Sequence, residues 1–118
     1  MNLKLTTRSR DGVTVLYASG RIVFGEESIE LREQVKEILS QTRQLVLNLG
    51  GVSYIDSGGI GTLVGLFTSA RAAGGDIKLA NLTQRVGDLL QITKLVTVFE
   101  VYPSEDAAIE AYARRATA

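Results

Sequence analysis

The sequence predicts an α/β fold with a mixed, mostly parallel sheet that carries an N-terminal β-hairpin and about four helices. Short apolar runs of strand type alternate along most of the chain with longer segments whose apolar residues recur at helical spacing. The first two strands instead follow one another across Asp11-Gly12, which is a hairpin turn signal. Strands joined through helices pair in parallel, and strands joined by a tight turn pair antiparallel. We therefore expect the order β-β-α-β-α-β-α-β-α.

The first half of the chain contributes the hairpin, a helix and a strand. In the hairpin every second residue is apolar: Leu3 and Leu5, then Val13, Val15 and Tyr17. From Glu26 to Ser40 a glutamate-rich first turn precedes apolar residues at i, i+4, i+7 and i+8, which predicts an amphipathic helix. Residues 45–49 are apolar apart from Asn48 and predict a buried strand.

The second half begins with a helix predicted from about Gly58 to Ala73, which ends at Gly74-Gly75, where positive φ is favourable. A short strand over residues 77–80 and a short helix capped by Asn81 or Thr83 follow. The last strand is predicted from three valines: Val96, Val98 and Val101. A final helix then begins after Pro103, with Ser104 as its cap and Arg114-Arg115 near its C-terminus.

Composition favours one domain over residues 1–118 and excludes several classes of function. The 13 basic residues balance 13 acidic ones without a dense basic cluster, so we expect no nucleic-acid partner. Neither cysteine nor histidine is present, which removes most metal, redox and hydrolytic chemistry, and we expect no metal and no cofactor. The N-terminus lacks a signal-peptide core, and no apolar run approaches the ~18 residues of a membrane span, so we expect a cytoplasmic protein without membrane insertion. Four scattered cations are interpreted as solvated side chains: Arg8, Arg10, Lys36 and Arg71.

The most distinctive stretch is the glycine-rich turn of residues 54–61, between an apolar strand and an apolar helix. It places Ser57 close to the N-cap of the helix, where backbone N–H groups lack intrahelical partners and the dipole favours negative charge. A phosphoryl group on Ser57 would be tolerated there and would add roughly −1.5 to −2 charges. The turn is therefore a candidate modification site that can change a surface without refolding the domain.

Each residue of the turn also has a purely structural interpretation. Serine is a favoured N-cap residue, and Asp56 has the residue type of an ordinary turn. Gly58, Gly59 and Gly61 lie in a first helical turn, where glycine costs up to ~1 kcal/mol relative to alanine. Bare backbone there favours either close approach by another molecule or tight packing under the loop of residues 21–25, and glycine content does not separate the two.

Enzymatic interpretations of the turn lack their required partners. The Lys-Ser/Thr that follows the glycines of a phosphate-binding loop is absent, and Gly59, Gly61 and Gly65 do not form a dinucleotide fingerprint. As a catalytic nucleophile Ser57 would need a base, and the chain has no histidine and no lysine near Ser57 in sequence. We expect a protein that is not an enzyme.

The turn and its flanks resemble the STAS domain of bacterial anti-sigma factor antagonists. The resemblance rests on residues 48–61, 70–75 and 77–81, and on the tail of residues 89–99 and 102–108. It implies a STAS-like fold and a protein, monomer or weak dimer, that binds an anti-sigma factor with serine kinase activity while Ser57 is unphosphorylated and releases it when Ser57 is phosphorylated. A separate serine phosphatase would reverse the modification. The implied partner-binding residues are Asp56, Ser57, Gly58, Gly59, Ile60, Gly61, Val23 and Phe24.

Two departures from the family pattern leave alternatives open. Val23 stands where the family commonly has an acid, and Gly58 where it often has a second serine or threonine. One alternative is therefore a STAS scaffold without a phosphorylation switch, or the accessory subunit of a lipid transporter. A remoter alternative is a phosphotransfer receiver with Asp56 as phosphoacceptor. A receiver needs further acids for a divalent metal near the end of the first strand, and residues 6–10 contain none.

Overall fold

The computed structural model describes residues 3–117, apart from the side chains of Val96 and of residues 115–117. Its strands are β1 (Leu3–Arg10), β2 (Val13–Ile22), β3 (Gln44–Ile55), β4 (Asp76–Ala80) and β5 (Glu100–Tyr102). Its α-helices are α1 (Glu26–Leu39), α2 (Ser57–Ala72), α3 (Gln84–Ile92) and α4 (Glu105–Thr117), and a short 3₁₀ helix, η1, spans Leu95–Thr97. The sheet has the order β1-β2-β3-β4-β5, with β1 antiparallel to β2 and the other neighbours parallel. The predicted fold class is confirmed.

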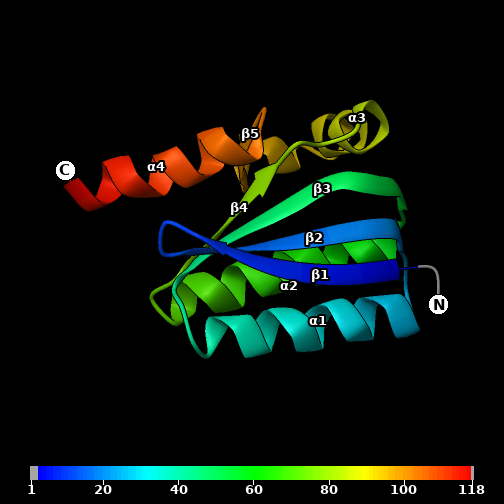
Figure 1. The fold of residues 1–118 in the computed structure, drawn as a ribbon. Helices are drawn as coiled ribbons and strands as arrows, with labels where there is room; N and C mark the ends of the chain where they lie inside the picture. The colour runs from blue at the N-terminus through cyan, green and yellow to red at the C-terminus, as the bar shows by residue number, and fades with distance from the viewer. Residues whose placement is uncertain (1–2, 118) are drawn as a thin grey trace.

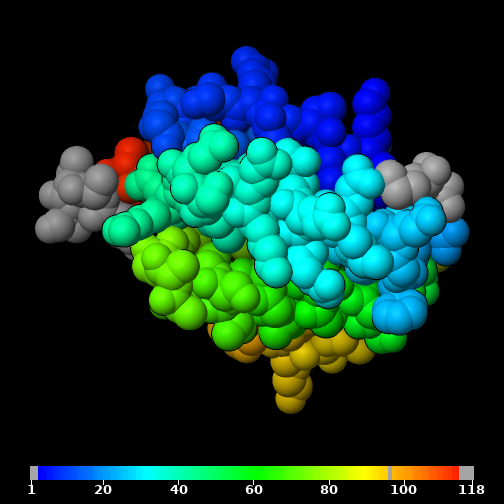
Figure 2. Space-filling model, turned by 90° about the horizontal axis from the view of Figure 1, so that it is seen from below, coloured from blue at the N-terminus to red at the C-terminus, as the bar shows by residue number. Residues whose placement is uncertain are grey.

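Helices cover both faces of the sheet (Figure 1). Figure 2 shows one face covered by α1 in cyan and α2 in green, with β1 in blue along one edge. Alternate residues of β3 serve the two sides: Leu45, Leu47 and Leu49 belong to the larger apolar core, whereas Val46 packs in a smaller cluster with residues of α4. Because both faces are buried here, residues 45–49 are apolar apart from Asn48, as expected for the buried strand that the sequence predicts.

Strand β3 is longer than the predicted residues 45–49, and its second half positions the functional turn. It pairs with β4 only over residues 44–48 and continues beside β2 to Ile55, with register shifts between Tyr17 and Ser19 and between Gly20 and Arg21 of β2. The other side of this second half contacts α3, since the Thr83 hydroxyl donates to the carbonyl of Val52 at 3.2 Å. Thr83 also caps α3, whereas Asn81 adopts a positive φ of 58°. Of the two candidate caps, Thr83 is the correct one.

The predicted last strand is wrong in extent. Residues 95–97 form η1 after Lys94, which has a left-handed backbone, and β5 is limited to three residues, Glu100–Tyr102. The helical turn is closed by hydrogen bonds from the amides of Val98 and Phe99 to the carbonyl of Leu95. The turn directs Phe99 into the core, where its ring meets Phe67 edge-on at 5.1 Å. The valine spacing therefore belongs to a turn and a short strand.

Helix α4 is fixed at its start to the opening hairpin. Ser104 caps it, as predicted, with its hydroxyl accepting from the amide of Ala107 at 3.1 Å. Arg10, at the end of β1, forms ion pairs with Glu105 and Asp106. The interpretation of Arg10 as a solvated cation is therefore wrong, because only the fold brings these sequence-distant carboxylates together. Among the helices of residues 3–117, none is long and apolar enough to cross a membrane.

Candidate functional site

Asp56 joins the start of α2 to the loop between β2 and α1. It is the N-cap of α2, with extended backbone, and its Oδ1 accepts from the amide of Gly59 at 2.8 Å. Both carboxylate oxygens also lie 3.1 Å from the amide nitrogen of Phe24, and the amide of Asp56 donates to the carbonyl of Ile22. The cap is thus Asp56, and Ser57 is the first residue of the helix, close to the N-cap as the sequence predicts.

The pKa of Asp56 lies below its usual value. The hydrogen bond from the Gly59 amide is the main cause, and the amides of Phe24 and Gly58 and the positive charge of Arg21 act in the same direction against the effect of burial. The ionised carboxylate is the form that accepts these amides. The connection between α2 and the β2–α1 loop therefore depends on the charge of Asp56.

We expect acid to remove the stabilisation that Asp56 provides. Because its folded pKa is lower than its unfolded pKa, this contribution is complete above the unfolded pKa of about 4 and is lost as the pH falls through the folded pKa. An Asp56→Asn variant keeps a neutral cap but not the charge, so its unfolding free energy should fall below wild type at pH 7 and converge with wild type in acid. Urea unfolding at pH 7 and pH 3 measures this. Parallel pH profiles for the two proteins would contradict it.

The glycines of the turn fall into two classes. A Cβ at Gly58 would lie 2.6 Å from the Cβ of Phe24, and one at Gly59 would lie 2.1 Å from the carbonyl oxygen of Ile22. For these two, tight packing under the β2–α1 loop is the reason for glycine. A Cβ at Gly61 meets nothing within 4 Å, and neither does one at Gly65. Packing therefore explains why no serine or threonine stands at position 58, and it does not explain Gly61.

Alanine should have opposite effects at two glycines of the same helix. Gly59→Ala forces a methyl group against the backbone of β2, which cannot rotate away, and we expect a loss of about 2–3 kcal/mol of unfolding free energy. Gly61→Ala adds a methyl group in open space and should stabilise the protein by about 0.5–1 kcal/mol through helix propensity. Urea unfolding followed by circular dichroism measures both. Similar destabilisation by the two variants would refute the assignment.

Ser57 is exposed, and among the described residues its hydroxyl makes no hydrogen bond. Phe24, whose backbone amide Asp56 holds, is 82% exposed. Val23 is half-buried, and its carbonyl accepts from the hydroxyl of Ser28 at 2.7 Å. The structure thus brings the predicted residues of the β2–α1 loop against those of the α2 start. It leaves one hydroxyl available at the surface between them.

A cavity of about 400 Å³ on the other side of Ser57 was not predicted from the sequence. Residues of β3 and α2 line it with residues of α3: Tyr54, Ile55, Asp56, Ser57, Ile60, Arg85, Val86, Asp88, Leu89, Ile92 and Thr93. Ile92, at the end of α3, is 78% exposed. The second half of β3 places Tyr54, and Asp56 just after it, alongside α3. The sequence pattern predicted only residues 45–49 of this strand, so it did not predict the cavity.

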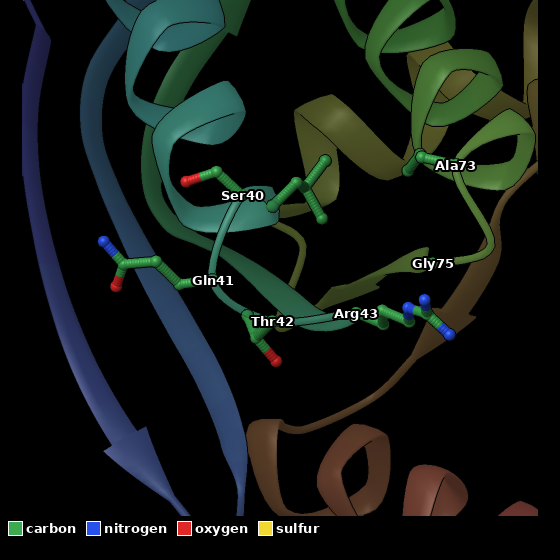
Figure 3. Close-up of a pocket in the computed structure, with 8 residues that line it drawn as sticks. Ser40, Gln41, Thr42, Arg43, Ala73 and Gly75 are labelled. Carbon is green, nitrogen blue, oxygen red and sulfur yellow. The ribbon is translucent and has the colours of Figure 1, made fainter.

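A second cavity, of about 360 Å³, lies at the opposite end of α1 and α2 (Figure 3). Residues from the α1–β3 connection and from the end of α2 line it. The side chains of Gln41 and Arg43 point in different directions and do not converge on a common point (Figure 3). Within residues 3–117, no group of three or more acidic side chains is arranged to hold a metal ion. The Ser57 region is therefore the better candidate site.

The chain is similar to anti-sigma factor antagonists in sequence and in fold. It is 28% identical over 110 residues to the anti-sigma-B factor antagonist of Bacillus subtilis, covering 93% of this chain and 100% of that protein. A putative anti-sigma factor antagonist of Thermotoga maritima has the same fold, with a TM-score of 0.82, 22% identity and coverage of 91% and 92%. The Bacillus cell fate determinant SpoIIAA in its phosphorylated form superposes with a TM-score of 0.67, 19% identity and coverage of 93% and 98%.

The fold also occurs in proteins of another name. A sulfate transporter family protein from Wolinella succinogenes superposes with a TM-score of 0.70, 20% identity and coverage of 89% and 87%. Likeness at this level of identity concerns the fold and leaves the activity to be argued from the site. The family model described as the STAS domain matches residues 4–108, which is most of the sequence. The chain belongs to the STAS domain family.

Proposed function

We propose that this protein is an anti-sigma factor antagonist that acts by partner switching. With Ser57 unmodified it binds an anti-sigma factor that has serine kinase activity, and phosphorylation of Ser57 releases that partner. A serine phosphatase restores the binding form. The protein catalyses none of these steps. The observation that carries the proposal is the exposed Ser57 hydroxyl at the start of α2, where Asp56 holds the helix against the loop of the apolar Phe24 and a largely apolar cavity lies beside α3.

Helix α2 presents an unusually bare face next to Ser57. Ser57, Gly61 and Gly65 are spaced at i, i+4 and i+8, and all three are exposed. The two glycines are not required by contacts within the chain, because a Cβ at either would meet nothing within 4 Å. Of the two explanations that the sequence left open for Gly61, packing and close approach of another molecule, only close approach remains, and the same explanation fits Gly65. A partner seated there would cover Ser57.

A phosphate at Ser57 would change this surface rather than the fold. The Asp56 carboxylate already accepts the amides of Gly59 and Phe24, so the phosphate does not take over the hydrogen bonds that hold α2 to the loop. It adds roughly −1.5 to −2 charges beside apolar side chains that a partner would otherwise cover. An interface that buries this charge without a cation on the partner is strongly disfavoured.

Phosphorylation in vitro tests the acceptor. The protein is incubated with ATP and each purified anti-sigma serine kinase of its host, and incorporated phosphate is measured by intact mass. We expect wild type and a Ser53→Ala control to be modified, and Ser57→Ala not to be. Ser53 is a fair control because it is an exposed serine of β3 four residues before Ser57. Equal incorporation in Ser57→Ala, or none in wild type with any kinase, would refute the proposal.

The alternatives lose part of their support. Gly58 is required by its contact with Phe24, so it does not indicate loss of a switch. The scaffold or lipid-transporter alternative then rests on Val23 and on the occurrence of the same fold in a transporter family protein. A receiver would need Asp56 as a free nucleophile, whereas its carboxylate accepts two backbone amides. Partner switching is the function we retain.

A further inference from the structure

Two guanidinium groups lie against the ring of Tyr54, two residues before Asp56. Arg21 is the register partner of Tyr54 on β2, and its Cζ lies 5.5 Å from the ring centroid. Arg85 comes from the first turn of α3, and its Cζ lies 5.7 Å from the same centroid. Tyr54 itself is 38% exposed. The ring thus holds two cations from different elements at the edge of the site.

Neither arginine forms a close ion pair. Within the described part of the chain, neither Arg21 nor Arg85 forms an ion pair within 4.0 Å. Arg85 also lies in the first turn of a helix, where the dipole disfavours positive charge. Both side chains make the cation–π contact, which is worth about 0.5–1 kcal/mol when exposed, and Arg21 also acts on the Asp56 carboxylate through its charge. Their positive charge is available to an anion.

Arg85 and Ser57 line the same cavity. Arg21 is close enough to Asp56 for its charge to lower the pKa of that carboxyl. The other charged groups that face the cavity are the carboxylates of Asp56 and Asp88, and Asp88 accepts from the side-chain amide of Gln84 at 2.8 Å. The charged lining of the cavity is thus two aspartates and Arg85, and Arg21 lies beside it at the Tyr54 ring. Because the two signs are mixed here, the local partners of the phosphoryl group decide its position.

The backbone amides at the start of α2 are not those partners. At the start of α2, the amide of Gly59 donates to the Asp56 carboxylate and the amide of Ile60 donates to the Asp56 carbonyl. The Gly58 amide also acts on that carboxylate, so the donors that a helix N-terminus usually offers to phosphate are largely engaged. The strong donors left on the cavity wall and its rim are guanidinium groups, whose planar fork suits phosphate oxygens. We propose that Arg21 and Arg85, held against the Tyr54 ring, form a binding site for the phosphoryl group of phosphorylated Ser57.

This site deepens the proposed function, on which it rests for the presence of phosphate at Ser57. Arg85 leaves the ring of Tyr54 and bridges from α3 to the start of α2, and Arg21 supplies the second positive charge. Phosphorylation then has two effects: it adds charge, and it places a guanidinium group across the cavity that a partner would use. The phosphate is held by its own protein and is less available to a phosphatase.

The second pKa of phosphoserine reports the neighbouring cations. Phosphoserine is incorporated at position 57 during synthesis of the full chain, and its ³¹P resonance is titrated between pH 4 and pH 8 (about two units around a second pKa of about 6). We expect Arg85→Gln to raise this pKa by about half a unit and Arg21→Gln to raise it by a smaller amount, with both shifts reduced by salt. Arg85→Lys should raise this pKa less than Arg85→Gln does, because lysine keeps the positive charge but lacks the planar guanidinium that binds two phosphate oxygens.

Arg43→Gln is the matched control. Arg43 is an exposed arginine just before β3, whereas Ser57 follows the end of that strand, so the same charge change is made at the opposite end of the sheet. We expect its titration to match wild type. A second readout is the Nε–H resonance of Arg85, which should move downfield in the phosphorylated protein only. Equal phosphate titrations for wild type, Arg85→Gln and Arg43→Gln would overturn the site.

Failure of this site and failure of the proposed function can be distinguished. The phosphate is introduced during synthesis, so the titration needs neither a kinase nor a binding partner. Unchanged titrations would remove the arginine site and leave partner switching untouched. Absence of kinase labelling at Ser57 would remove partner switching, and the titration would still show whether these arginines hold a phosphate. Each variant is accepted for titration only with a native circular dichroism spectrum.

Discussion

Phosphoserine at position 57 is expected to lower the affinity for the anti-sigma partner by about 30-fold to several thousandfold, which corresponds to about 2–5 kcal/mol. The reason is the position of Ser57 between an exposed Phe24 and a cavity lined by Ile60, Leu89 and Ile92. A partner that covers these apolar side chains removes water from the phosphate as well. The charge is then buried, which is strongly disfavoured wherever the partner supplies no cation to match it.

Isothermal titration calorimetry with the kinase that labels Ser57 in vitro measures this effect. Ser57→Asp provides a milder version, because one carboxylate carries less charge than phosphate. Ser9→Asp is the control: Ser9 is exposed on β1 beside the start of β2, at the opposite end of the sheet from Ser57. We expect the control to bind as wild type does. A phosphorylated protein with wild-type affinity and a native circular dichroism spectrum would show that Ser57 lies outside the interface.

Replacing Lys78 by alanine is expected to be the most destabilising single change, with a loss of about 3–5 kcal/mol. Lys78 is 1% exposed, and its ammonium group lies 2.6 Å from Glu100 and 3.5 Å from Asp76. The ammonium is also 4.7 Å from the ring centroid of Tyr112, and the Tyr112 hydroxyl donates to a backbone carbonyl in the same region. Alanine removes the cation from the carboxylates and leaves a cavity beneath α4.

Lys78→Met separates the loss of the charge from the creation of a cavity, since methionine fills much of the same volume without the charge. We expect it to lose clearly less stability than Lys78→Ala, and we expect the pair Lys78→Met with Glu100→Gln to recover part of the remaining loss. Urea unfolding of the four proteins measures these differences. A Lys78→Ala protein within 1 kcal/mol of wild type (well below the usual effect of breaking a buried ion pair) would refute a structural role for the buried cation.

The sequence predicted an element correctly where its alternation of apolar and polar residues repeats over several helical turns or over several residue pairs of a strand. The helix at residues 26–40 and the hairpin around Asp11-Gly12 are of this kind, and both are confirmed. The last strand was mispredicted because three valines two to three residues apart fit a strand, whereas the left-handed Lys94 starts a 3₁₀ turn. The extent of β3 depended on pairing with β2 across two register shifts, which no local pattern encodes.

The candidate site likewise has a part that the sequence predicted and a part that it did not. The turn residues Asp56 and Ser57 and the nearby glycines were recognisable, because a strand, a hydroxyl and bare backbone follow one another directly in the chain. Tyr54 was seen only as part of that turn, and Arg85 was not recognised at all. Their proximity to Ser57 depends on where α3 lies against β3, and sequence spacing does not show this. Whether each glycine serves packing or access also required the Cβ distances of the folded chain.

The most direct test of the central claim is the phosphorylation state of Ser57 in the native host. The protein is purified under phosphatase inhibition from growing and stressed cells, and intact mass and tryptic peptides are measured. Trypsin releases Ser57 in the peptide 44–71, and fragmentation separates it from Ser53 and Ser69 in the same peptide. We predict a fraction of the protein that carries an addition of about 80 Da, one phosphoryl group, on Ser57. Unmodified Ser57 in every growth condition, in a host that expresses an active anti-sigma serine kinase, would contradict the account.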